Sequence, residues 1–119
     1  MPQFRKERVS ELLKQTISDI LTHDIKDPRT LGVTITEVLM SSDLKSARVF
    51  FSSLADGEIE AHLKGLGKAE GFIRHRLREE LDLKYIPTLT FFYDSSFDHS
   101  VKIAKILKEI ESTAVDKND

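Results

Sequence analysis

The chain has 119 residues, of which 39% are hydrophobic and 32% charged, and its formal net charge is −2. That length suits one domain with a single core, and the absence of cysteine excludes a disulfide scaffold, a thiolate metal site and a thiol nucleophile. No apolar run approaches the length of a membrane span and no signal peptide is recognisable, so we expect a cytoplasmic protein without a membrane anchor.

Residues 4–24 contain the clearest predicted helix. Its apolar stripe recurs at three- and four-residue spacing and consists of Val9, Leu12, Leu13, Thr16, Ile17, Ile20 and Leu21. Asp27-Pro28 ends the pattern, because the residue before proline avoids the helical region. Arg5, Lys6 and Arg8 lie at the helix start, where cations typically cost about 0.3–1 kcal/mol against the helix dipole. Two interpretations of these three cations are equally open: they bind a partner, or they form a simple solvated face.

Two strands are predicted next, over residues 33–40 and 47–52. Both are rich in β-branched or aromatic residues, and the polar turn 41–45 between them is short enough for an antiparallel hairpin. Alternation predicts that Ala47, Val49 and Phe51 share one face of the second strand.

Residues 58–82 read as helix, yet three glycines interrupt them. Gly65, Gly67 and Gly71 would each cost about 1 kcal/mol relative to alanine inside a helix. We therefore predict a helix, a kink at Ala69-Glu70-Gly71 and a second helix.

A third strand is predicted over residues 88–93 and a last amphipathic helix over residues 101–110. The long helical connection between the second and third strands favours a right-handed crossover, which makes these strands parallel if they are adjacent. The predicted fold class is α+β: a single domain over residues 1–111 with a three-stranded sheet and helices on one face. Residues 112–119 form a short polar tail.

Positive charge gathers around the glycines despite the negative total. Residues 64–78 contain five Lys or Arg and one acid, a local net charge of +4 that leaves −6 for the rest of the chain. Arg74, His75 and Arg78 follow Gly71 at three, four and seven residues and are predicted to form a solvent-side basic face. Surface ion pairs such as Glu70–Arg74 are the alternative explanation. A glycine-marked helix start with cations on the next turns favours phosphate binding.

Catalytic and metal sites find little support. The polar residues of 94–99 are neighbours in one predicted loop and are explained by helix capping, whereas catalytic triads converge from separate elements. His23, Asp24 and Asp27 lack a recognisable metal-ligand spacing. We predict that the protein is not an enzyme and that it carries no cofactor and no metal.

The order of elements resembles the type II KH domain of RNA-binding proteins, with Ala69-Glu70-Gly71 where such domains have a Gly-x-x-Gly loop. An Ala-x-Gly kink in that place is typical of the ribosome-binding factor A family, which the chain resembles over about residues 4–110. The other segments that carry the resemblance are Asp27-Pro28-Arg29, Val33-Thr34-Ile35-Thr36, Ser42-Asp43-Leu44, Ala47-x-Val49, Ser52, Gly71-Phe72-Ile73-Arg74, Pro87-x-Leu89-x-Phe91 and Asp94-x-Ser96.

The resemblance implies a bacterial ribosome assembly factor that binds the small (30S) ribosomal subunit, contacts its 16S rRNA and assists late maturation, notably of the RNA 5′ end. It also implies a role in growth in the cold, and release with the help of a separate GTPase. We expect no basic C-terminal extension of the kind that some members carry, since the last residues are Asp116-Lys117-Asn118-Asp119.

We therefore expect a monomer that holds rRNA through phosphate contacts and does not read bases. The candidate contacts are Lys68, Arg74, His75, Arg78, Lys64, Arg5, Lys6 and Arg8, with Lys45 and Arg48 less favoured. Glu70 makes a single-strand clamp at the kink unfavourable, because its charge would face a phosphate. The alternative is a protein–protein module or homodimer that uses an exposed sheet face. That face would carry Thr34, Thr36, Val38, Phe50 and Phe92.

Overall fold

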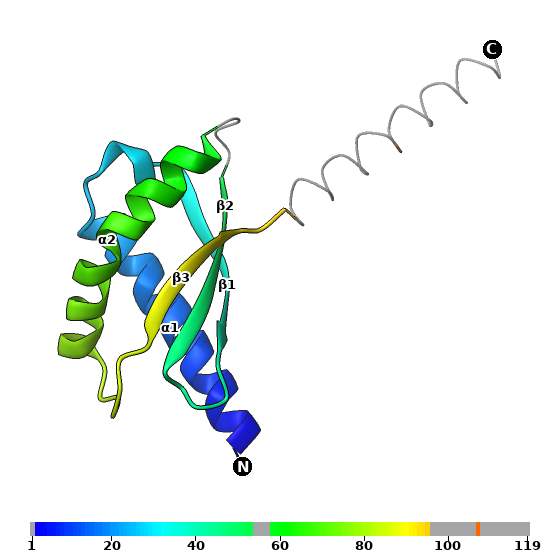
Figure 1. The fold of residues 1–119 in the computed structure, drawn as a ribbon, viewed down its shortest axis with the longest axis vertical. Helices are drawn as coiled ribbons and strands as arrows, with labels where there is room; N and C mark the ends of the chain where they lie inside the picture. The colour runs from blue at the N-terminus through cyan, green and yellow to red at the C-terminus, as the bar shows by residue number, and fades with distance from the viewer. Residues whose placement is uncertain (1, 54–57, 96–106, 108–119) are drawn as a thin grey trace.

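A computed structural model describes residues 2–53, 58–95 and Leu107. The elements are, in chain order, helix α1 (Pro2–His23), the 3-10 helix η1 (Pro28–Thr30), strands β1 (Val33–Met40) and β2 (Ser46–Ser53), helix α2 (Ile59–Glu80) and strand β3 (Thr88–Tyr93). Both α-helices lie on one face of the three-stranded sheet (Figure 1). The predicted α+β fold is confirmed. The predicted last helix and the tail lie outside the described residues, apart from Leu107, which is helical.

The sheet has the strand order β1-β2-β3. β1 and β2 pair antiparallel through the turn at residues 41–45, and β2 and β3 pair parallel, with Ala47 opposite Leu89 and Phe51 opposite Tyr93. The connection between the parallel strands runs through α2, as the long helical link requires. The predicted hairpin and the predicted parallel crossover are both confirmed.

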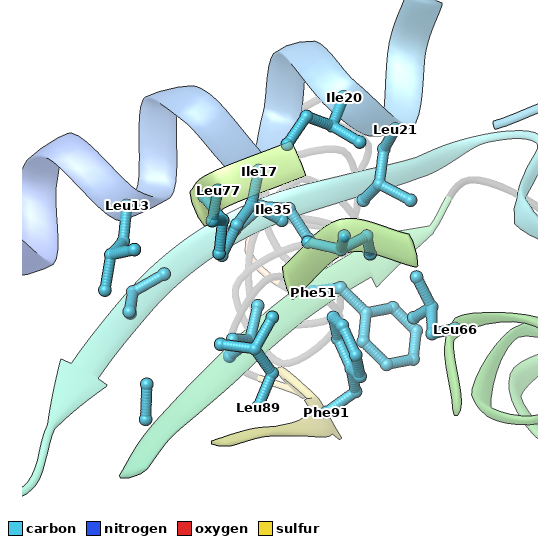
Figure 2. Packing of buried hydrophobic residues seen from close by; sticks show 14 of the residues in the cluster. Leu13, Ile17, Ile20, Leu21, Ile35, Phe51, Leu66, Leu77, Leu89 and Phe91 are labelled. Atoms are coloured by element: carbon cyan, nitrogen blue, oxygen red, sulfur yellow. The ribbon is translucent and has the colours of Figure 1, made fainter. Parts of the chain in front are cut away.

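The core lies between the sheet and the two helices, and Figure 2 shows how their apolar side chains meet. The largest fully buried side chains are Leu13, Ile17 and Ile20 of α1, Val49 and Phe51 of β2, Leu66, Ile73 and Leu77 of α2, and Pro87. Burying one such aliphatic or aromatic side chain contributes about 1.5–3 kcal/mol. Alternation along β2 predicts this correctly, since Ala47, Val49 and Phe51 all face the helices.

A β-bulge changes which side chains of β1 face the core. The pairing of β1 with β2 shifts between Ile35 and Glu37, so that one residue of β1 has no direct partner. Beyond the shift, Val38 is buried in the core and Leu39 is exposed. The prediction that Val38 lies on the uncovered face is therefore wrong. It assumed strict alternation along the strand, which does not hold past the extra residue of a bulge.

Helix α2 is one continuous helix, so the predicted division into two helices is wrong, whereas the predicted kink at Ala69-Glu70-Gly71 stays a prediction. Every residue from Ile59 to Glu80 is helical, although the helix changes direction about midway in Figure 1. Leu66, Ala69, Ile73 and Leu77 are all buried, so one apolar stripe continues past the glycines. Side chains at Gly67 and Gly71 would meet nothing within 4 Å, so no neighbour forces the backbone out of the helix there.

Gly65 is different, because η1 packs directly against it. A Cβ atom at Gly65 would lie 2.9 Å from Arg29 Cβ and 3.2 Å from Thr30 Cγ2. His62, one turn earlier, is buried with Nδ1 2.6 Å from the carbonyl oxygen of Arg29 and Nε2 2.8 Å from Ser53 Oγ. Because a carbonyl oxygen only accepts, Nδ1 carries a proton and donates it to Arg29. The close approach at Gly65 and the His62 bonds therefore fix η1 on α2.

We expect Gly65→Ala and Gly67→Ala to change stability in opposite directions. Gly67→Ala enters open space and should stabilise by up to about 1 kcal/mol through helix propensity. Gly65→Ala must push against Arg29 and Thr30, and overpacking of this kind costs about 1–3 kcal/mol. Urea unfolding of the two variants measures both values. Equal stabilisation by both would contradict the close packing of η1 on Gly65.

Candidate nucleic-acid interface

Four of the predicted contacts form a row along the solvent side of α2. With 3.6 residues per turn, Lys64, Lys68, His75 and Arg78 fall within an arc of about 80° that points away from the core. All four are exposed, and Gly71 lies open between the second and third of them. We call these four residues the outward row. It spans about 21 Å at 1.5 Å per residue, which is enough for several phosphates.

Members of the outward row differ in their partners. His75 Nε2 lies 2.8 Å from Glu79 Oε1, on a part of the helix where both side chains are at least half exposed. Lys64, Lys68 and Arg78 form no ion pair within the described part of the chain. These three cations are therefore available to an external anion without loss of an internal contact.

Arg74 lies on the flank of α2, beside β3, and is half-buried. Its Nη2 donates to the carbonyl oxygen of Ile86 at 3.2 Å, and its Nη1 lies 4.0 Å from Glu70 Oε1. Glu70 Oε2 in turn accepts from the backbone N–H of Leu89 at 3.4 Å. Glu70 and Arg74 together join α2 to the start of β3. The structure thus places Glu70 beside the sheet edge and away from the outward row.

A second group of predicted contacts lies near the start of α1. Arg5 and Arg8 are exposed, whereas Lys6 continues the buried stripe toward the N-terminus and is half-buried. Lys6 and Arg48 line one groove of about 680 Å³ between α1 and β1. That groove also contains Lys14 and four acids, Glu7, Glu11, Glu37 and Asp94, so its charge is mixed.

The hairpin turn between β1 and β2, which includes Lys45, lies toward the same end of the molecule as the N-terminus (Figure 1). Asp43 organises this turn: its Oδ1 accepts from Ser41 Oγ at 2.6 Å and from the backbone N–H of Lys45 at 3.0 Å. These bonds lower the pKa of the Asp43 carboxyl, the serine hydroxyl contributing most. The Lys45 side chain is exposed, and the structure brings it to neither the outward row nor the groove.

The loop before β1 contributes residues that sequence analysis did not include among the contacts. A hollow of about 260 Å³ lies between this loop and α2, and its lining includes Lys26, Lys68 and the half-exposed ring of Phe72. Asp27 fixes the loop: it accepts from the Arg29 backbone N–H at 2.9 Å and from Arg29 Nη2 at 2.7 Å. The sequence Asp27-Pro28-Arg29 indicates this turn, since an Asp side chain commonly accepts a hydrogen bond from the backbone N–H two residues later.

The bonds to Arg29 hold the pKa of Asp27 at about 2, compared with 3.8 for an ordinary Asp. The Arg29 side chain is the largest cause and its backbone N–H the next, while Lys68 adds a smaller Coulombic effect. Lys68 is therefore close enough to this loop for its charge to be felt there.

Within residues 2–53 and 58–95, no three His, Asp or Glu side chains converge as metal ligands. The helices described here are also too polar or too short to cross a bilayer.

The profile of the ribosome-binding factor A family matches residues 5–107, a range that includes every predicted contact. The ribosome-binding factor A of Thermodesulfovibrio yellowstonii is 40% identical over 113 residues, which cover 95% of this chain and 96% of that relative. The chain belongs to the ribosome-binding factor A family.

Solved structures agree on the fold. The crystal structure of ribosome-binding factor A from Thermus thermophilus has a TM-score of 0.68 at 23% identity, and the match covers 74% of this chain and 93% of that one. A homology model of the Thermus thermophilus protein, fitted into a cryo-EM map of its complex with the 30S subunit, has a TM-score of 0.62 at 22% identity. That match covers 72% of this chain and 91% of the other.

We expect the contribution of Asp27 to stability to disappear in acid. The folded-state pKa is depressed, so the contribution is complete above about pH 4 and is lost as the pH falls toward about 2. Asp27→Asn should therefore lower the urea midpoint at pH 6 and change it much less at pH 2. Asp82→Asn, on an exposed residue after α2, is the matched control. An equal effect of Asp27→Asn at both pH values would contradict the assigned pair.

Proposed function

We propose that this protein is a ribosome assembly factor that binds the small ribosomal subunit and contacts its 16S rRNA. The observation that supports this most strongly is membership of the ribosome-binding factor A family over residues 5–107. The Thermus thermophilus protein, which shares the fold, has been placed in a complex with the 30S subunit. We extend that partner to this chain.

We further propose a role in late maturation of the subunit. The protein assists processing of the 16S rRNA 5′ end, supports growth in the cold, and leaves the subunit with the help of a separate GTPase. It acts in the cytoplasm, as a monomer and without catalysis of its own.

The outward row is our proposed rRNA contact. Its cations point away from the core, and three of them have no internal ion pair among the described residues. We propose a KH-like fold in which phosphates contact the helix. No Gly-x-x-Gly clamp takes part in this contact. Glu70 does not oppose this contact, because its carboxylate is turned toward Leu89.

The remaining candidates contribute less in this proposal. Arg74 supports the site by joining α2 to β3, so its removal would disturb the fold as well as any contact. Arg5 and Arg8 form a second exposed basic region at the start of α1. Lys6 and Arg48 lie in a groove of mixed charge, where phosphate is less favoured.

Binding to purified small subunits should depend on salt through the outward row. Each lost phosphate contact should make the slope of log K against log salt concentration shallower by about 0.7–0.9, and the loss should not depend on RNA sequence. Lys68→Gln and Arg78→Gln should each produce this change, and the double variant about twice as much. Sedimentation with small subunits at several salt concentrations measures the slope.

Lys84→Gln is the matched control, since Lys84 is exposed, lies after α2 and belongs to no part of the row. Its slope should equal that of the unmodified protein. If the double variant also kept the unmodified slope while binding persisted, the subunit would be the partner but the outward row would not be the contact.

Depletion of the protein from cells should cause small-subunit precursor rRNA with an unprocessed 5′ end to accumulate, most strongly at low temperature. Primer extension on total RNA measures that end. The purified protein should leave the same precursor uncut, because the proposed role is to assist processing by other factors. Cleavage of precursor RNA by the protein alone would contradict the non-enzymatic role.

A further inference from the structure

The hollow between α2 and the loop before β1 has an aromatic ring in its wall. Phe72 lines this hollow and is 44% exposed, although Ile73, the next residue of α2, is completely buried. A single exposed phenylalanine on a protein surface needs no special explanation. Phe72 is different because it lines a concave surface that also contains charged side chains.

The two acids that line the hollow each have an arginine partner. Asp24 Oδ2 lies 3.4 Å from Arg76 Nη2. Asp27 Oδ2 lies 2.7 Å from Arg29 Nη2. Because each carboxylate already faces a guanidinium group, neither acid presents an uncompensated negative charge that would repel an anion at the hollow.

Lys26 and Lys68 supply the unpaired charge of the hollow. Both side chains are exposed, and neither forms an ion pair within residues 2–53 and 58–95. Lys68 lies four residues before Phe72 on α2, a spacing that places Cβ atoms about 5–6 Å apart. Lys26 lines the hollow from the loop. An aromatic ring with cations beside it is the arrangement that binds single-stranded nucleic acid, since bases stack on the ring and phosphates meet the cations.

The size of the hollow limits what it can hold. Its volume of about 260 Å³ is smaller than the roughly 300–1,000 Å³ of pockets that enclose a drug-sized ligand. Gly65 and Ala69 line it from α2, and they add at most a methyl group to the space. One planar base suits such a hollow, and an unpaired base enters it without the cost of leaving a duplex.

We propose that this hollow binds one unpaired base of the RNA, stacked on Phe72, while Lys26 and Lys68 contact the phosphates on either side of it. The inference rests on the proposed function and adds a stacking contact beside the outward row, to which Lys68 belongs. Every base has a π face, so this contact requires no reading of sequence. It does require that the rRNA is locally single-stranded where it meets the hollow.

Loss of the ring should weaken binding to purified small subunits without changing its salt dependence. Phe72→Leu should lower the affinity about 5–100-fold at every salt concentration, since stacking on the ring is lost and no phosphate contact is removed. Phe72→Tyr keeps the ring and should bind as the unmodified protein does. Phe92→Leu is the matched control, because Phe92 is 39% exposed on the sheet face opposite the helices, and its affinity should not change. Sedimentation measures the affinities, and urea unfolding shows that each variant is folded.

A second experiment separates bases from phosphates. The chain contains no tryptophan, so Phe72→Trp places a single fluorescent reporter in the hollow. A short unstructured oligoribonucleotide should quench its emission by stacking, whereas an abasic oligomer of the same length and charge should not. Phe92→Trp should be quenched by neither oligomer.

Unchanged affinity of Phe72→Leu for small subunits would overturn the base site and leave the proposed function intact. A loss of affinity without quenching by the oligoribonucleotide would assign Phe72 to a protein surface of the subunit, and equal quenching by both oligomers would leave a phosphate contact alone. Either result would overturn the base site. Failure of the unmodified protein to bind small subunits would contradict the proposed function itself, and the base site would fall with it.

Discussion

The packing of α2 on the sheet is the interaction on which the rest of the structure depends. Leu66, Ile73 and Leu77 are fully buried by it, and each contributes about 1.5–3 kcal/mol. Gly67 and Gly71 oppose the helix by only about 1 kcal/mol each. The apolar stripe therefore outweighs the glycines, and the helix continues through them. The same helix forms the crossover that places β3 parallel to β2.

That packing also sorts the charges of α2. Once the stripe faces the sheet, the 3.6-residue repeat sends Lys64, Lys68, His75 and Arg78 to the opposite side. Residues on the flank meet neighbouring elements: Arg74 contacts the carbonyl oxygen of Ile86, and Arg76 Nη2 lies 3.4 Å from Asp24 Oδ2 at the end of α1. A chain with net charge −2 can thus present a row of cations: Glu70 is turned toward Leu89, and His75 is the one row member with an ion-pair partner, Glu79, among the described residues.

Much of this arrangement could be predicted from sequence. Periodicity identified the strands, both described helices and most of the core, since 2.0- and 3.6-residue repeats depend only on neighbours in the chain. The need for glycine at position 65 could not be predicted from sequence. It arises because Arg29, more than thirty residues away in the chain, packs closely against that position. The bond from Arg74 to Ile86 could not be predicted either. Its acceptor is a backbone carbonyl, which any residue type supplies.

The β-bulge in β1 was beyond sequence analysis for a related reason, and it links two features of the molecule. The Thr36–Asp94 hydrogen bond lies at the bulge and joins residues 58 positions apart in the chain. The bulge reverses the alternation of β1, which buries Val38 and turns Leu39 outward, opposite Arg48 of β2. The same hydrogen bond fixes Asp94, and with it the point at which the chain leaves the sheet. The bulge in β1 thus accounts for the outward position of Leu39 and also holds the residue that bonds the end of β3.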